Sequence, residues 1–270
     1  NDLFSSFPTR KRQIKMTKLP HIARYIVASS VPPNLTEGLY LAEKVRSSLL
    51  KISDGHPVFL GRNSEGSVGQ GHQHTYILPE ANGRDGRITH ITLYAKMGFD
   101  RDARYTLERL HKVWGHEGHD VRLVLIGVGK SEDFGGMNKE AGQSQLLGTS
   151  QTWISRTPFI PTRHPKTYND GRAKYDASQL QIGSPEHDLR RLLQEMECPE
   201  VIQIEKVTGT ELGDRLTPWL KFQTQRKQGK GQRSSRRGFG FSIEFAEPWT
   251  GPLALGYGAH YGLGAFEALP

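Results

Sequence analysis

The chain has 270 residues, 35% of them hydrophobic and 24% charged, which suits one large or two small packed domains and excludes disorder throughout. A single cysteine excludes a disulfide framework and favours a reducing, cytoplasmic location, and no apolar run approaches the roughly 20 residues of a membrane span. The net charge of +8 points to a polyanionic partner if the basic residues cluster rather than spread thinly.

Residues 1–130 predict a basic tail followed by one compact unit. Apolar spacing in this unit predicts strand, helix, strand, strand, helix and strand, the split βαβ order of a ferredoxin-like domain with an antiparallel sheet. The strand at 87–97 places His90 with Ile88, Thr92 and Tyr94 on one face. The predicted elements are 21–29, 34–52, 56–63 with 71–79, 87–97, 102–115 (ending at Gly115) and 121–129.

The pattern then repeats less regularly. A Gly-rich, polar stretch at 129–143 reads as a linker, after which 152–161 predicts a strand and 185–197 a helix. Strands are expected at 200–209, 218–226 and 238–256, the last from the alternation of phenylalanines and Ile243. The fold class is therefore α+β, with two tandem ferredoxin-like (RRM-like) domains and antiparallel sheets. The expected boundaries are a tail at 1–19, domains at 20–130 and 151–270, and a linker at 131–150.

Two basic runs stand out. The run at 9–18 is expected to be a solvated tail, whereas the run at 221–240 contains no acidic residue and would attract a polyanion and release counterions on binding. The candidate RNA-binding cations of this second run are Arg226, Lys227, Lys230, Arg233, Arg236 and Arg237. Arg163 and Lys166, beside His164, are further candidates for phosphate contact, and a solvated turn explains them equally well.

The sequence GYGAHYGLGAF near the C-terminus holds four glycines in nine residues. Too few residues follow for a dinucleotide-binding helix, and no Gly-Lys-Ser/Thr is present for a phosphate-binding P-loop. A bulged strand whose glycines permit tight packing is one explanation. The alternative is a loop whose bare N–H groups bind phosphate while its aromatic rings stack on bases. The RNA-binding candidates of this loop are Gly256, Tyr257, Gly258, His260, Tyr261, Gly262 and Gly264.

With two ferredoxin-like halves, this glycine-rich ending resembles the RAMP superfamily of CRISPR-associated RNA-binding proteins, in particular its repeat-RNA-processing endoribonucleases. The stretch GHQHTYILPEANGRDGRITHITLYA (71–95) resembles the nuclease half of the fused backbone-plus-nuclease subunit of type I-G systems. The resemblance implies metal-independent cleavage of the CRISPR repeat transcript, leaving a 2′,3′-cyclic phosphate and a 5′-hydroxyl. It also implies other type I effector subunits as partners, with the basic start as the remnant of a linker to a backbone half upstream.

Eleven histidines are many for this length, and His72, His74 and His90 fall in one predicted hairpin. Cleavage by internal transfer needs a base for the 2′-hydroxyl proton and an acid for the leaving 5′-oxygen, and imidazole suits both roles near neutral pH. We expect His74 to be catalytic first, His72 second and His90 third. Each histidine is equally compatible with a turn or core hydrogen bond, because the three need not meet in space.

Other sites fit these residues less well. The spacing of the three histidines matches no zinc signature, and Ala81 and Gly83 stand where a calcium loop needs acidic ligands, so neither metal nor cofactor is expected. HITLY has the form of a two-histidine phosphoesterase motif, but a second copy is absent. The leading hypothesis is thus an endoribonuclease acting on CRISPR repeat RNA. A non-catalytic RNA-binding subunit of the surveillance complex is the main alternative, and a cyclic phosphodiesterase is the third.

Overall fold

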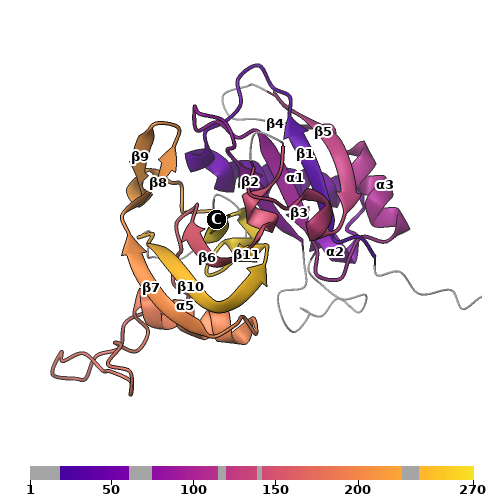
Figure 1. Cartoon of the computed structure of the whole chain (residues 1–270). Coiled ribbons are helices and arrows are strands. Elements are labelled where there is room, and N and C mark those ends of the chain that lie inside the picture. Colours follow the sequence, from indigo (N-terminus) through magenta and orange to yellow (C-terminus); the bar gives the residue numbers. More distant parts are fainter. Residues whose placement is uncertain (1–18, 61–74, 115–119, 139–141, 227–236) are drawn as a thin grey trace, which may run out of the picture.

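The computed structural model describes residues 19–60, 75–114, 120–138, 142–226 and 237–270 (Figure 1). Two five-stranded sheets dominate it, and every strand pair within them is antiparallel. Within the described ranges, every helix is too short or too polar to span a bilayer.

The first sheet has the order β2-β3-β1-β5-β4. Its first four strands in that order give the ferredoxin-like arrangement, with the first strand of the unit in the centre, and β4 adds a short hairpin at the edge. The strands are β1 (Ile22–Val27), β2 (Tyr76–Glu80), β3 (His90–Tyr94), β4 (Lys112–Trp114) and β5 (Asp120–Gly129).

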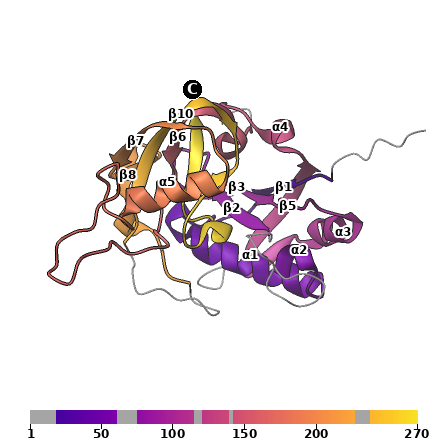
Figure 2. The ribbon, with the colours of Figure 1, turned by 90° about the horizontal axis from the view of Figure 1, so that it is seen from below.

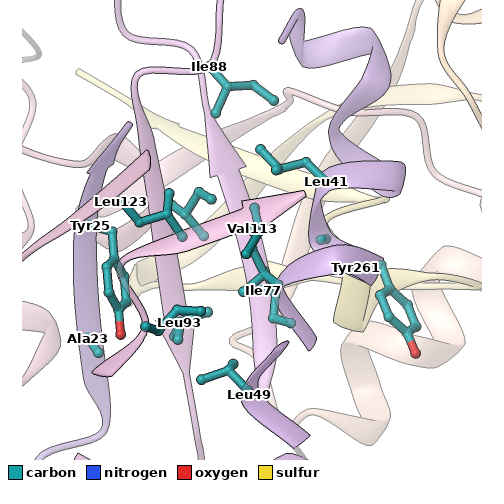
Figure 3. Packing of buried hydrophobic residues seen from close by; sticks show 14 of the residues in the cluster. Ala23, Tyr25, Leu41, Leu49, Ile77, Ile88, Leu93, Val113, Leu123 and Tyr261 are labelled. Atoms are coloured by element: carbon teal, nitrogen blue, oxygen red, sulfur yellow. The ribbon is translucent and has the colours of Figure 1, made fainter. Parts of the chain in front are cut away.

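The helices α1 (Gly38–Ile52) and α3 (Arg101–Arg109) cover one face of this sheet. A short 3₁₀ turn, η1 (Leu35–Glu37), leads into α1, and the side chain of Asp100 caps α3 by accepting from the N–H of Ala103 at 2.8 Å. Tyr25 and the other core-facing residues of β1 pack on the face that α1 and α3 cover (Figure 3). The opposite face carries Arg24, and the short turn α4 (Ser131–Phe134) packs against its β5 edge, where Phe134 lies beside Gly127.

The second sheet has the order β11-β12-β6-β10-β7. Its strands β12, β6, β10 and β7 again follow the ferredoxin-like order, and α5 (Pro185–Glu195) covers one face. In place of the second helix, the chain between β10 and β12 forms the short strand β11 and the 3₁₀ turn η5 (Ala259–Tyr261). The strands are β6 (Thr149–Ser155), β7 (Val201–Val207), β10 (Gly240–Thr250), β11 (Leu253–Ala254) and β12 (Ala265–Leu269).

The tandem ferredoxin-like fold predicted from the sequence is therefore confirmed, the second unit lacking one helix. The expected alternation on β10 also holds, because Phe241, Ile243 and Phe245 are all buried. A two-stranded hairpin of β8 (Gly209–Leu212) and β9 (Arg215–Pro218) projects beyond β7 and contacts the first half, where Leu212 lies beside Gly86.

Four local predictions are wrong. The strand expected at 56–63 is instead the helical turn α2 (Pro57–Leu60), and the strand expected at 218–226 begins as the 3₁₀ turn η4 (Trp219–Lys221). The helix expected to reach Gly115 ends at Arg109, and β4 follows it. The strand at 121–129, expected to be buried, exposes alternate residues, including Val124.

The stretch read as a linker has structure of its own. It contains the turn α4 (Ser131–Phe134) and the 3₁₀ turn η3 (Gln145–Leu147), whose Leu146 and Leu147 are buried. A small apolar cluster joins Leu146 to Leu78 of β2 and to Ala259 of η5. The two halves are therefore packed together along β2, and Figure 2 shows the C-terminal segment reaching α1 of the first half.

Candidate nucleic-acid interface

The glycine-rich segment lies between the two halves of the molecule. Residues 259–268 are buried, and η5 is flanked by Gly258 and Gly262 in the left-handed conformation, with φ of 75° and 81°. A β-carbon on Gly262 would lie 2.6 Å from Cδ of Pro79 in β2, closer than such atoms can approach. The glycines therefore serve close packing, the first of the two explanations that the sequence left open.

Most N–H groups of this segment are used inside the protein. They donate to carbonyl oxygens at 2.8–3.2 Å, so the expectation of amides open to phosphate is wrong for these five residues: Tyr257, Tyr261, Gly262, Leu263 and Gly264. Residues 256–258 are only partly buried. Direct RNA contact by the glycine-rich segment stays a prediction, and this is the part at which the segment reaches solvent.

Two guanidinium groups lie near the ring of Tyr261. The Cζ atom of Arg46 in α1 lies 5.5 Å from the ring centroid and that of Arg226 lies 4.5 Å from it, and Arg46 also donates to the tyrosine hydroxyl. Arg226 in turn pairs with Glu43 of α1, with 3.0 Å between Nε and Oε1. A buried Tyr261 with both neighbours in place does not present a free ring to a base. It instead fixes the position of Arg226, the first of the candidate RNA-binding cations at 226–237, which form the basic segment.

His260, the neighbour of Tyr261 in η5, contacts the start of β2. Its ring centroid lies 3.9 Å from that of Tyr76, and burial raises the pKa of the Tyr76 phenol to about 12, so this hydroxyl is neutral at physiological pH. Tyr76 comes two residues after His74 in the chain. One turn, η5, thus contacts two residues that matter for the prediction. They are Tyr76, shortly after His74 in the chain, and Arg226, the first cation of the basic segment.

His90 is the one predicted catalytic histidine among the described residues, because His72 and His74 lie outside them. It stands on the face of β3 opposite α1 and α3, half-buried, with 2.9 Å between its Nδ1 and the hydroxyl of Thr89. Burial lowers its pKa, and the nearby Arg24 cation lowers it further against the opposing effect of Glu80. His90 is therefore a neutral imidazole at pH 7, suited to accept a proton rather than to donate one.

A buried ion pair next to His90 has no counterpart in the sequence prediction. Arg24 of β1 and Glu80 of β2 approach to 3.2 Å with side chains 0% and 1% exposed, and Thr92 donates to the same carboxylate. Arg24 also donates to the carbonyl of Gly142 at 2.7 Å, which ties the first sheet to the connecting segment. The available signal was an arginine in an otherwise apolar strand, at the alternate position to Ala23 and Tyr25.

Arg163 and Lys166 are exposed and lie in the long connection between β6 and α5. The connection is anchored by Asp188, which accepts from the hydroxyl and N–H of Thr162 and from Arg191. Burial alone would raise the pKa of Asp188, but these hydrogen bonds outweigh it and hold the pKa below its usual value. Both cations are thus accessible on a segment that Asp188 holds in place. Direct contact of either cation with RNA stays a prediction.

Of the remaining predicted cations, the structure describes one, Arg237. Arg237 lies with its Cζ 5.4 Å from the ring centroid of Phe239. Four others lie outside the described residues, namely Lys227, Lys230, Arg233 and Arg236. Among the side chains that the structure does describe, no three His, Cys, Asp or Glu residues gather as metal ligands would. Burial raises the pKa of Cys198 to about 12, so its thiol is protonated and unreactive at neutral pH.

No family model and no curated protein matches the chain. Among solved structures, one described as a CRISPR-associated protein Cas6 has a TM-score of 0.42 at 11% sequence identity, with 92% of this chain and 98% of that chain covered. A Cas6 product complex has a TM-score of 0.38 at 12% identity, with 94% and 100% covered. At these values the function has to be argued from the residues of this chain.

Proposed function

We propose that this chain is an endoribonuclease that cleaves CRISPR repeat RNA without a metal and stays bound to the stem-loop of its product. One observation carries the proposal: adjacent residues of η5, His260 and Tyr261, contact Tyr76 and Arg226. These contacts bring together Tyr76, two residues after His74, and Arg226, the first cation of the basic segment. The catalytic imidazoles and a cation that binds a polyanion are therefore expected close together.

The chemistry follows from the residue types. A neutral imidazole removes the proton of a ribose 2′-hydroxyl, the 2′-oxygen attacks the adjacent phosphorus, and the bond to the 5′-oxygen breaks. A protonated imidazole supplies the proton that the leaving oxygen needs, and the products are a 2′,3′-cyclic phosphate and a 5′-hydroxyl. We assign the principal role to His74, with His72 as its partner. His90 is suited to the role of base only, because its lowered pKa keeps it neutral.

The cations have a separate task. Arg226 and Arg237 at the two ends of the basic segment, with Arg163 and Lys166, are proposed to bind phosphates and so to position the RNA. The partly buried residues 256–258 are proposed to approach the RNA backbone. Membership of a type I-G effector complex, with a backbone half and other subunits as partners in the cytoplasm, rests on the sequence resemblance alone.

Cleavage of labelled repeat RNA tests the catalytic proposal. We expect cutting in excess EDTA, no cutting of RNA with a 2′-deoxy at the scissile nucleotide, and a loss of about 100-fold or more for His74→Ala. His111→Ala is the matched control, since His111 is exposed and lies outside the predicted hairpin of His72, His74 and His90. Wild-type rates in the His72, His74 and His90 variants would contradict the assignment of the site. Tight binding of repeat RNA without any cleavage would instead support the non-catalytic RNA-binding subunit.

A further inference from the structure

The second half contains a groove that the proposed cleavage site does not use. It has a volume of about 530 Å³ and lies on the helix-free face of the second sheet, beneath the β8–β9 hairpin. Binding sites for small organic molecules typically measure about 300–1,000 Å³, so the groove is large enough for one nucleoside.

The floor of the groove is a buried ion pair. Nε of Arg156, one residue beyond β6, lies 3.3 Å from Oε1 of Glu267 in β12, with side chains 10% and 7% exposed. The same guanidinium donates to the carbonyls of Glu211 and Ala81. Arg156 therefore joins the sheet, the hairpin and the first half of the molecule, and it fixes the shape of the groove before any ligand binds.

The walls combine aliphatic surface with both kinds of hydrogen-bonding group. Ile154, Val207 and Leu216 offer apolar surface to the faces of a planar ring. Thr208 and Glu211 add hydrogen-bonding groups to the lining. Lys206 borders the groove through its place in β7, but it lies opposite the buried Phe241, on the face of the sheet that α5 covers. Apart from Lys206, the charged lining residues are the paired Arg156 and Glu267 and the anion Glu211, which together carry a net formal charge of −1.

We infer that this groove binds the base of a single unpaired nucleotide. A lining without net positive charge gives no net attraction to a phosphate, whereas a nucleobase is a flat, neutral ring with donors and acceptors along its edge. That the nucleotide belongs to an RNA strand rests on the proposed function, while affinity for the nucleoside itself does not.

The test uses the full chain and the four ribonucleosides, with inorganic phosphate as the charged probe, in ligand-observed NMR or calorimetric titrations. We expect at least one nucleoside to bind at millimolar concentration and phosphate to bind more weakly. Leu216→Trp should fill the groove and weaken that nucleoside at least tenfold. Leu220→Trp is the matched control, because Leu220 is 85% exposed and is not part of the groove. Thr208→Tyr, at the rim, is a second blocking variant if Leu216→Trp fails to fold.

Equal affinities of the Leu216→Trp and Leu220→Trp proteins would overturn the inference, as would a preference for phosphate over every nucleoside. The readout is independent of RNA cleavage. A wild-type protein that cuts repeat RNA but binds no nucleoside would contradict the groove assignment alone. A protein that binds a nucleoside in a Leu216-dependent manner but neither binds nor cuts repeat RNA would contradict the proposed function alone.

Discussion

The two halves share a strand order and differ in how they use one arginine. Arg24 lies in the first strand of its unit and Arg156 directly follows the first strand of the other, and each forms an ion pair with a glutamate. The first pair is sealed within the packed molecule. The second borders the groove, where solvent or a ligand can reach it. A buried arginine–glutamate pair at the first strand can therefore serve internal cohesion in one unit and a surface groove in the other.

The largest expected effect comes from removing the sealed cation. Arg24→Met leaves the Glu80 carboxylate buried without its counter-charge, which should cost about 3–5 kcal/mol in the free energy of unfolding. Arg156→Met should cost less, about 1–3 kcal/mol, because water in the groove can reach Glu267. Urea denaturation of both variants measures the difference.

The double variant Arg24→Met/Glu80→Met is the control for this comparison. It should recover much of the loss, because two apolar side chains leave no unpaired charge behind. Equal losses of unfolding free energy in the two single variants would contradict the comparison. They would mean that water reaches neither ion pair, although the Arg156–Glu267 pair is the more exposed of the two.

A smaller effect tests the missing helix of the second half. Where the first unit has α3, the second has the glycine-rich turn packed on β2, so Gly262→Ala should destabilise the protein by about 2–4 kcal/mol, from left-handed strain and overlap with Pro79. Gly171→Ala isolates the strain. Gly171 also has a positive φ, 84°, but a β-carbon there would meet nothing within 4 Å, so about 1 kcal/mol is expected.

Thermal or urea unfolding of the two alanine variants makes this comparison directly. If Gly262→Ala cost no more than Gly171→Ala, the turn would not be packed against β2 as described. A repeat-RNA binding assay on the folded Gly262→Ala protein would then show whether the contact also matters for function.

The smallest effect is a difference in pH dependence between the halves. His90 on the first sheet has a pKa below 6.5, so the unfolded chain binds a proton more readily than the folded chain does. Its contribution to stability is present above pH 6.5 and is lost as the pH falls toward the folded pKa. His90→Gln should flatten this decline, measured as the free energy of unfolding between pH 7 and pH 5. Parallel profiles for the two proteins would contradict it.

The position of His21 sharpens the same experiment. Burial also lowers the pKa of His21, which lies edge-on to Tyr94 at 6.0 Å between ring centroids on this sheet. The decline that remains in His90→Gln should therefore diminish again in the double variant His90→Gln/His21→Gln. No further change in the double variant would mean that His21 is not linked to folding.

Local sequence signals determined much of this protein. The alternation along β10, the apolar stripe of α1 and the Ser184-Pro185 start of α5 each specify an element within a few residues, and their order gives two ferredoxin-like units. Segments of three or four residues, such as α2 and β4, were beyond reach because so short a segment does not distinguish a period of 2 from one of 3.6.

The tertiary structure alone decided what surrounds the predicted site. The sequence drew attention to the glycines before β12 but could not tell packing from phosphate binding, since both need backbone without side chains. Three features depend on contacts between residues far apart in the chain. Gly262 packs against Pro79, Tyr261 contacts both Arg46 and Arg226, and Arg156 lines the groove. Local patterns fix the elements, whereas such contacts form only when the two halves pack together.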